Sequence, residues 1–293
     1  MVSLWIVVVD AARLWLSSGW CRKGDYASMW VCPASSGQSL QGSCCQMEIK
    51  VITYNIHKGF NTGNQRFVLS QIRDLLEQEH ADIVFLQEVH GATSRRKNKL
   101  GTFPDIPHFE YLADKLWPHY AYGKNAIYRK GHHGNAILSK YPFRFWENID
   151  ISNHRLASRS ILHGVVELPG GVPLHTLCVH MGLFQSERTR QLDTLIERIE
   201  SHVPHEEPLL IAGDFNDWKR VAELHFEEDL DVRELFEVLT GRHALTYPVW
   251  LPILPMDRIY FRGIEPLSCA CLDSGAWRKL SDHAALSGVY RCC

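Results

Sequence analysis

Hydrophobic and polar residues follow regular periods from Met47 onward. Residues 48–54 alternate and are rich in β-branched side chains, which predicts a strand ending at Asn55. Residues 66–79 place apolar side chains on one face of a helix. The same criteria predict further strands over 82–88, 120–122, 126–129, 135–138, 160–168, 173–179, 209–214 and 255–261 and a last one ending at Tyr290, and helices over 109–117, 185–201 and 232–239.

Two glycine-containing segments are predicted to be turns. Pro169-Gly170-Gly171 separates two alternating runs, a pattern typical of a β-hairpin. Residues 131–134, Gly-His-His-Gly, are predicted to turn between two short strands. The chain shows no internal repeat or low-complexity tract, so its strands and helices could form two stacked sheets with helices outside.

Residues 1–46 differ from the remainder of the chain. They hold four of the nine tryptophans but show no sustained period. Their apolar start lacks the basic residues of a signal peptide, and Asp10 and Arg13 interrupt it before it is long enough to span a bilayer. We therefore expect an N-terminal extension over 1–46, either disordered or upstream of the natural start at Met47, followed by one domain over 47–293.

Charge and cysteine content narrow the cellular setting. The net charge of −2 and the pI near 6.8 give no overall basic field that would gather polyanions, which disfavours constitutive coating of nucleic acid. The nine cysteines show no C-x-x-C pair or zinc-ligand spacing. We therefore expect a reducing, cytoplasmic location.

Polar side chains recur where the predicted strands end or begin. Each has an ordinary structural explanation when taken alone. The residues of Asp214-Phe-Asn216, for example, are common in turns. Taken together they favour a site, because strand termini gather at one sheet edge and would bring carboxylates, amides and imidazoles close to one another. The group consists of Asn55, Glu88, His180, Asp214, Asn216, Asp257, Asp282 and His283.

Six segments that carry these residues resemble, in order, the endonuclease/exonuclease/phosphatase superfamily of DNase-I-like phosphoesterases. The resemblance spans Met47 to Tyr290 and implies an α/β fold, a four-layer αββα sandwich of two stacked mixed β-sheets with outer helices, so that 47–293 is the catalytic domain. The segments are Thr53-Tyr-Asn55, Leu86-Gln-Glu88-Val, Val179-His180-Met-Gly-Leu, Gly213-Asp214-Phe-Asn216, Met256-Asp257-Arg-Ile-Tyr and Ser281-Asp282-His283.

Three further segments resemble a bacterial metal-dependent hydrolase branch of this superfamily: Asn55-Ile-His-Lys-Gly59, Tyr122-Gly-Lys-Asn125-Ala and Gly131-His-His-Gly-Asn135-Ala. The resemblance implies a divalent cation held by Glu88, with Asn55 and Asp282 contributing directly or through water. Such oxygen ligands suit Mg²⁺, and Mn²⁺ is a plausible substitute.

The resemblance also implies catalytic roles for five residues. Asp257 would fix the tautomer of His283 and raise its basicity, so that the pair acts as general base on the attacking water. Asp214 is the competing candidate for that base. Asn216 and His180 would donate hydrogen bonds to the phosphoryl oxygens as charge builds on them.

Secondary positions are expected to face the substrate or to shape turns. Arg159 begins a strand and could reach phosphate or form a surface ion pair, and Trp218 is expected to pack. The substrate-binding candidates are Tyr122, Asn125, Asn135 and His57.

These observations lead to the hypothesis of a Mg²⁺-dependent hydrolase that cleaves a phosphodiester or phosphomonoester by direct water attack. The slight acidity of the chain, with its basic run confined to residues 94–99, favours a lipid or small-molecule phosphoester over long nucleic acid. A nuclease is the alternative, and a non-catalytic phosphate-binding protein is a remote one. Membrane contact stays open, and we expect a monomer.

Overall fold

The computed structural model describes residues 47–63, 65–93, 106–128, 131–152, 159–219, 226 and 230–292. The predicted extension over 1–46 and the basic run over 94–99 lie outside these residues. Among the described residues, no helix is long and apolar enough to cross a membrane. Cys178, Cys269 and Cys271 form no disulfide bond, and the cytoplasmic location stays a prediction.

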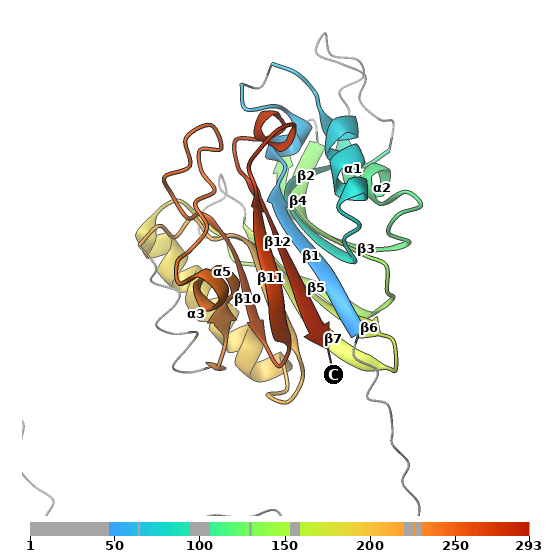
Figure 1. The fold of residues 1–293 in the computed structure, drawn as a ribbon, viewed down its shortest axis with the longest axis vertical. Helices are drawn as coiled ribbons and strands as arrows, with labels where there is room; N and C mark the ends of the chain where they lie inside the picture. The colour runs from blue at the N-terminus through green and yellow to red at the C-terminus, as the bar shows by residue number, and fades with distance from the viewer. Residues whose placement is uncertain are drawn as a thin grey trace, which may run out of the picture. The chain divides into compact units, whose positions relative to one another are not determined.

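The described strands form two mixed sheets of six strands each (Figure 1). The first sheet has the order β11-β12-β1-β2-β4-β3, with β1 and β2 parallel, and the second has the order β5-β6-β7-β8-β10-β9, with β7 and β8 parallel. The strands of the first sheet are β1 (Met47–Asn55), β2 (Ile83–Thr93), β3 (His119–Tyr128), β4 (Gly131–Ser139), β11 (Glu265–Leu272) and β12 (Ala285–Cys292). Those of the second are β5 (Phe143–Asp150), β6 (Ser160–Leu168), β7 (Val172–His180), β8 (Leu209–Asp214), β9 (Arg233–Glu234) and β10 (Asp257–Arg262).

Helices pack on the outer faces of the sheets. Alternate residues of each strand point to opposite faces, so Val51 of β1 enters a core shared with Leu210 of β8, while Ile52 joins a second core with Ile72 of α1. A third core joins the second sheet to α3. The predicted two-sheet sandwich with outer helices is therefore confirmed. The helices are α1 (Leu69–Gln78), α2 (His108–Ala113), α3 (Gln185–His202), α5 (Leu235–Thr240) and the short 3₁₀ turns η1 (His57–Gly59) and η2 (Trp277–Lys279).

Several element boundaries differ from the prediction. The turn predicted over residues 131–134 is wrong, because these residues belong to β4. A side chain at Gly134 would lie 1.8 Å from the carbonyl oxygen of Gly123, so this glycine permits close approach of β3 and does not mark a turn. The strands predicted over 120–122 and 126–129 form the single strand β3, helix α2 ends at Ala113, and β5, β9 and β11 were not predicted.

The strand predicted to end at Glu88 continues to Thr93. Its pairing with β4 shifts register between Leu86 and Val89, and Glu88 has a φ of 57°. Glu88 therefore lies at an irregularity inside β2. Such a bulge redirects a side chain without ending the strand, so the strand end predicted at residue 88 is wrong.

Candidate active site

Strand register brings three of the expected catalytic residues side by side. In the parallel pair β7 and β8, His180 is opposite Asp214, and in the antiparallel pair β8 and β10, Asp257 is opposite the same Asp214. Asn55 ends β1, and His283 precedes β12, so both come from the first sheet. Asn55 Nδ2 donates to Asp214 Oδ2 at 3.1 Å, which shows that the two sheets meet at this point.

A cleft of about 220 Å³ lies where these residues converge. Eight of the residues predicted from the sequence line it, and Asp257 lies behind one of them, His283, at 1% exposure. The lining residues are Asn55, His57, Glu88, Arg159, His180, Leu183, Asp214, Asn216, Tyr247, Met256, Asp282 and His283.

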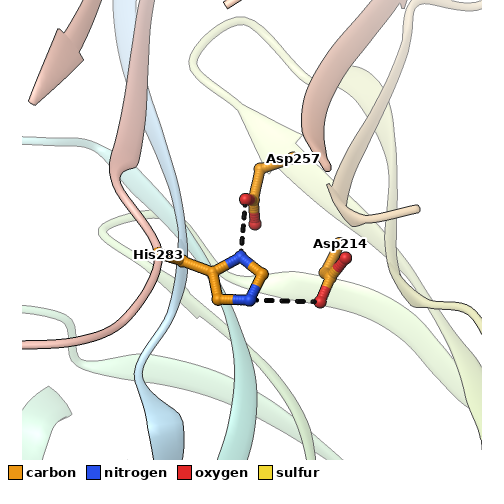
Figure 2. Close-up of side chains that lie close together, drawn as sticks. All are labelled: Asp214, Asp257 and His283. Atoms are coloured by element: carbon orange, nitrogen blue, oxygen red, sulfur yellow. Dashed lines mark hydrogen bonds and ion pairs between the residues drawn. The ribbon is translucent and has the colours of Figure 1, made fainter. Parts of the chain in front are cut away.

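His283 links two carboxylates of the second sheet. Its Nδ1 donates to Asp257 Oδ2 at 2.8 Å, and its Nε2 lies 3.9 Å from Asp214 Oδ2 (Figure 2). The backbone N–H of Asp257 donates to Thr246 Oγ1 at 3.1 Å, which helps to hold the carboxylate in place. Burial opposes a charge on His283, but Asp257 and Asp214 outweigh it and raise its pKa to about 10.

Asp214 is buried at the centre of the site. Its Oδ1 accepts the backbone N–H of Asn216 at 3.0 Å, and its Oδ2 lies 3.5 Å from His180 Nε2. Burial raises the pKa of Asp214 to about 7, although the charge of His283 acts in the opposite direction. A carboxyl group in this range can exchange a proton near neutral pH.

His180 and Asn216 present hydrogen-bond donors to the cleft. Burial, followed by the charge of Arg159, holds the pKa of His180 well below its usual value, so the imidazole is neutral. Asn216 Nδ2 donates one hydrogen bond to the carbonyl of Met181 at 3.0 Å and has a second N–H to offer. Both residues match the donor role expected of them, and that role stays a prediction.

The expected metal ligands face cationic side chains in this cleft. Glu88 Oε2 lies 3.1 Å from Lys58 Nζ, and Asp282 Oδ1 lies 3.2 Å from His57 Nδ1. Burial would raise the pKa of Glu88, but the ion pair with Lys58 lowers it. Burial would likewise raise the pKa of Asp282, and the hydrogen bond from His57 lowers it. Both carboxylates are thus ionised.

Hard oxygen donors from Glu88, Asp282 and Asn55 fit a divalent cation such as Mg²⁺. Asp214, Asp257 and His283 form another candidate group, with ligand atoms within 4.8 Å of one another. These three are already joined through His283, and the group includes a ring nitrogen. The oxygen set therefore suits Mg²⁺ better.

Three of the seven non-glycine residues with positive φ in the described part of the chain line the cleft. His57, Glu88 and Asn216 have φ values of 45°, 57° and 49°, and Lys58, beside Glu88, has 58°. Each such residue costs on the order of 1 kcal/mol and persists only where the surrounding structure enforces it. Together with the polar lining, this strain supports a functional role for the cleft.

Four of the lining residues were weakly indicated or missed by the sequence: Arg159, Tyr247 and the apolar Leu183 and Met256. Arg159, for which phosphate contact and a surface ion pair were both open, lines the cleft and donates from Nε to the carbonyl of Met181 at 3.1 Å. Tyr247 was not predicted, and its ring lies 4.9 Å from that of His283. It belongs to a loop between α5 and β10 with no period that could have revealed it.

Three of the four substrate-binding candidates lie outside the cleft lining; the fourth, His57, lines it. Tyr122 stacks on Phe109 with ring centroids 4.3 Å apart, and Asn125 accepts a hydrogen bond from Ser160. Asn135 Nδ2 donates to the carbonyls of Ser160 at 2.9 Å and Cys178 at 3.2 Å, joining the two sheets. These contacts have structural roles, and substrate contact stays a prediction for all three.

A two-sheet sandwich with carboxylates, amides and imidazoles at its strand ends defines the class of DNase-I-like α/β hydrolases. The sequence profile of the Endonuclease/Exonuclease/phosphatase family matches residues 52–283, and the chain belongs to this family. The predicted membership is therefore confirmed. The family acts in general on phosphoester bonds and usually depends on a divalent metal.

Relatives of known sequence or structure match most of this chain. "Uncharacterized protein YbhP" of Escherichia coli (strain K12) is 43% identical over 243 residues, which are 83% of this chain and 96% of that protein. A structure of an endonuclease/exonuclease/phosphatase from Beutenbergia cavernae has a TM-score of 0.66 at 19% identity, covering 84% of this chain and 72% of its own. D. rerio TDP2 complexed with single strand DNA product has a TM-score of 0.60 at 21% identity, covering 83% and 98%.

Proposed function

We propose that this protein is a metal-dependent phosphoesterase that cleaves its substrate by direct attack of water. The supporting observation is the convergence of Glu88, Asp214 and His283 from both sheets on one cleft, in a chain that belongs to a phosphoesterase family. Nothing in this arrangement requires a covalent phospho-enzyme.

The roles of the residues follow from their positions. Glu88, Asp282 and Asn55 would hold Mg²⁺, or Mn²⁺ in its place, which when bound would neutralise charge on the phosphoryl group. Asn216 and His180 donate to phosphoryl oxygens that gain charge in the transition state.

Proton transfer is assigned to the buried carboxylate that faces the cleft. Asp214 Oδ2 takes the proton of the attacking water, because Asp214 lines the cleft with a pKa of about 7, whereas His283, whose pKa is raised to about 10, already carries a proton at neutral pH. His283, oriented by Asp257, faces this oxygen through Nε2, and its positive charge favours the ionised form of Asp214 that accepts the proton.

The substrate class that fits best is a lipid or small-molecule phosphoester. The chain is slightly acidic overall, and the cleft of about 220 Å³ suits a small polar group better than a long polyanion. Leu183 and Met256 add apolar surface to the lining, so the group next to the phosphorus can be apolar. We expect the active form to be a monomer.

Hydrolysis of bis-p-nitrophenyl phosphate tests this proposal. The purified full chain should cleave it with Mg²⁺, lose activity with a chelator and regain it when Mg²⁺ is restored. Asp214→Ala and His283→Ala should each lower kcat by about a thousandfold, because each removes a group that acts in the transition state. Asp193→Ala, an exposed position on α3, is the matched control and should retain activity. Metal-independent cleavage, or full activity in both site variants, would contradict the proposal.

A nuclease is the second candidate, and one observation favours it. The TDP2 structure with a similar fold is complexed with single strand DNA product. Nicking of plasmid or trimming of single-stranded oligonucleotide, with loss of both activities in Asp214→Ala and His283→Ala, would identify nucleic acid as the substrate. A phosphodiesterase with a small or lipid substrate would leave the nucleic acid intact under the same conditions.

A further inference from the structure

Six exposed apolar side chains border the cleft on two sides. On one side, Leu183 and Phe184 follow β7, and Trp218 follows β8. On the other side, the remaining three belong to the loop between α5 and β10. Their exposed fractions run from 39% to 71%, well above those of the buried core. We call this set the apolar rim: Leu183, Phe184, Trp218, Trp250, Leu251 and Ile253.

Both sides of the apolar rim continue directly into the cleft. Leu183 itself lines the cleft, and Trp218 comes two residues after the lining residue Asn216. On the other side, Tyr247 lines the cleft, and the backbone N–H of Val249 donates to the carbonyl of Asp282 at 2.8 Å. In Figure 1 this orange loop lies toward the end of the molecule at which β1 ends. The rim is therefore part of the cleft mouth.

Hydrogen bonds hold the first side of the rim in place. Arg188 Nη1 donates to the carbonyl of Leu183 at 2.5 Å, and its guanidinium lies over the ring of Trp218, 4.7 Å from the centroid. Trp218, expected from the sequence to pack, is thus partly exposed and packs through a cation–π contact. Arg188 thus holds Leu183 through a hydrogen bond and Trp218 through a cation–π contact.

The second side is held in a similar way. Arg278 donates to the carbonyl of Trp250, the N–H of Leu251 donates to the carbonyl of Pro248 at 2.9 Å, and the N–H of Ile253 donates to that of Tyr247 at 3.1 Å. The loop backbone is satisfied internally while the side chains of Trp250, Leu251 and Ile253 point to solvent. Exposed apolar groups on such a braced frame are typical of an interaction surface.

The chemistry of the rim fits a phospholipid surface. Half of its members are aliphatic and offer no flat ring on which a nucleobase could stack, whereas aromatic and aliphatic side chains together insert well at the headgroup boundary of a bilayer. Exposed basic side chains adjoin them: Lys219 follows Trp218, and Arg278 and Lys279 lie in η2 beside Trp250. Basic groups next to apolar ones match the phosphates and acyl chains of anionic lipids.

We propose that the apolar rim docks this protein on the surface of a phospholipid bilayer and that the cleft receives a lipid phosphoester there. The docking depends on the rim alone, and the entry of a lipid phosphoester into the cleft rests on the proposed function. In this arrangement the phosphoester reaches Glu88 and Asp214 at the cleft floor while the apolar part of the lipid stays among the rim side chains.

Sedimentation with vesicles of phosphatidylcholine and phosphatidylglycerol tests the docking. The full chain should pellet with these vesicles, and Phe184→Ser combined with Trp250→Ser should weaken the binding by about tenfold or more, because two large apolar side chains are removed. Trp146→Ser is the matched control, since Trp146 is 48% exposed on β5 and outside the cleft lining. It should bind as tightly as the unaltered chain. Each single variant tests one side of the rim, and equal unfolding temperatures establish that the variants are folded.

Activity separates this inference from the proposed function. Phe184→Ser and Trp250→Ser, alone or combined, should leave cleavage of soluble bis-p-nitrophenyl phosphate at the unaltered rate, since neither Phe184 nor Trp250 lines the cleft. Failure to cleave this ester, together with rim-dependent vesicle binding, would overturn the proposed function and leave the docking intact. Absence of vesicle binding, or binding unaffected by the double variant, would overturn the docking. Rim-dependent binding of a single-stranded oligonucleotide without vesicle binding would overturn it as well.

Discussion

The two sheets supply carboxylates of opposite character to the same cleft. Glu88 of the first sheet and Asp282 beside it have side chains about a fifth exposed, 18% and 21%, and each faces a cationic side chain. Asp214 and Asp257 of the second sheet are 2% and 1% exposed. Neighbouring cations lower the pKa of Glu88 and Asp282, whereas burial raises the pKa of Asp214 to about 7.

This difference suits the carboxylates to different tasks: we call Glu88 and Asp282 the first half of the site and Asp214 and Asp257 the second half. Carboxylates that stay ionised suit a hard cation, and a carboxyl group that titrates near neutral pH suits proton transfer. His283 connects the two halves, because it precedes β12 of the first sheet and contacts Asp257 and Asp214 of the second. If the two halves differ in this way, substitutions in the second half should alter catalysis and its pH dependence, and substitutions in the first should alter the metal requirement.

Among substitutions that change only the environment of the site, Asp257→Asn in the second half is expected to have the largest effect. This substitution removes the negative charge of the Asp257 carboxylate, which His283 Nδ1 contacts. We therefore expect kcat to fall by about a hundredfold with little change in KM. The pH profile of kcat should also move, since Asp257 helps to raise the pKa of His283. Steady-state hydrolysis of bis-p-nitrophenyl phosphate across pH measures both changes.

Asp193→Asn on the exposed face of α3 is the control for that substitution and should leave kcat and its pH profile unchanged. Near-normal kcat in Asp257→Asn, with an unaltered pH profile, would show that His283 does not depend on this carboxylate.

The sequence predicted which residues converge on the cleft better than it predicted the bounds of the strands and helices. Asn55, His180 and Asp214 could be placed because each ends an apolar strand, and parallel neighbours align such ends. Glu88 lies inside β2, at a bulge that depends on the pairing of β2 with β4. The periodicity of the local sequence does not indicate such a bulge. Tyr247 belongs to a loop that tertiary hydrogen bonds hold at the cleft, so periodicity could not predict its position either.

Asn135 shows a limit of inference from sequence neighbours. Its place in a family-like segment predicts substrate contact, and in the structure its buried amide joins β4 to β6 and β7 of the other sheet, so the prediction stays open. A polar residue that bridges two sheets cannot be told apart from a binding residue by its neighbours in sequence, because the distinction depends on which strands stack above it.

The first half of the site should respond to metal rather than to pH. Glu88→Gln removes a charged oxygen ligand, so we expect the Mg²⁺ concentration for half-maximal activity to rise by about tenfold or more, with activity partly restored at high Mg²⁺. Glu77→Gln, exposed on α1, is the matched control. An unchanged Mg²⁺ requirement in Glu88→Gln would remove Glu88 from the metal set and would weaken the contrast between the two halves.

The second sheet also holds a histidine in surroundings opposite to those of His283. Arg198 Nε donates to His163 Nδ1 at 3.0 Å, and His163 Nε2 lies 2.9 Å from His175 Nδ1, whose Nε2 in turn lies 2.7 Å from Glu207. Burial, followed by the neighbouring His175, lowers the pKa of His163 to about 3. His163 is therefore neutral where His283 is charged.

The smallest effect is expected from acid acting on this buried histidine. Below an unfolded-state pKa of about 6.5, the unfolded chain binds a proton at His163 that the folded chain does not bind until about pH 3, so stability falls as pH drops through this window. Between about pH 7 and about pH 5.5 this residue should remove about 1 kcal/mol from the free energy of unfolding, and His163→Gln should lose correspondingly less. Urea unfolding at the two pH values measures the difference. Equal acid sensitivity in the variant would mean that His163 takes up its proton in the folded chain, and the contrast with His283 would then be one of degree.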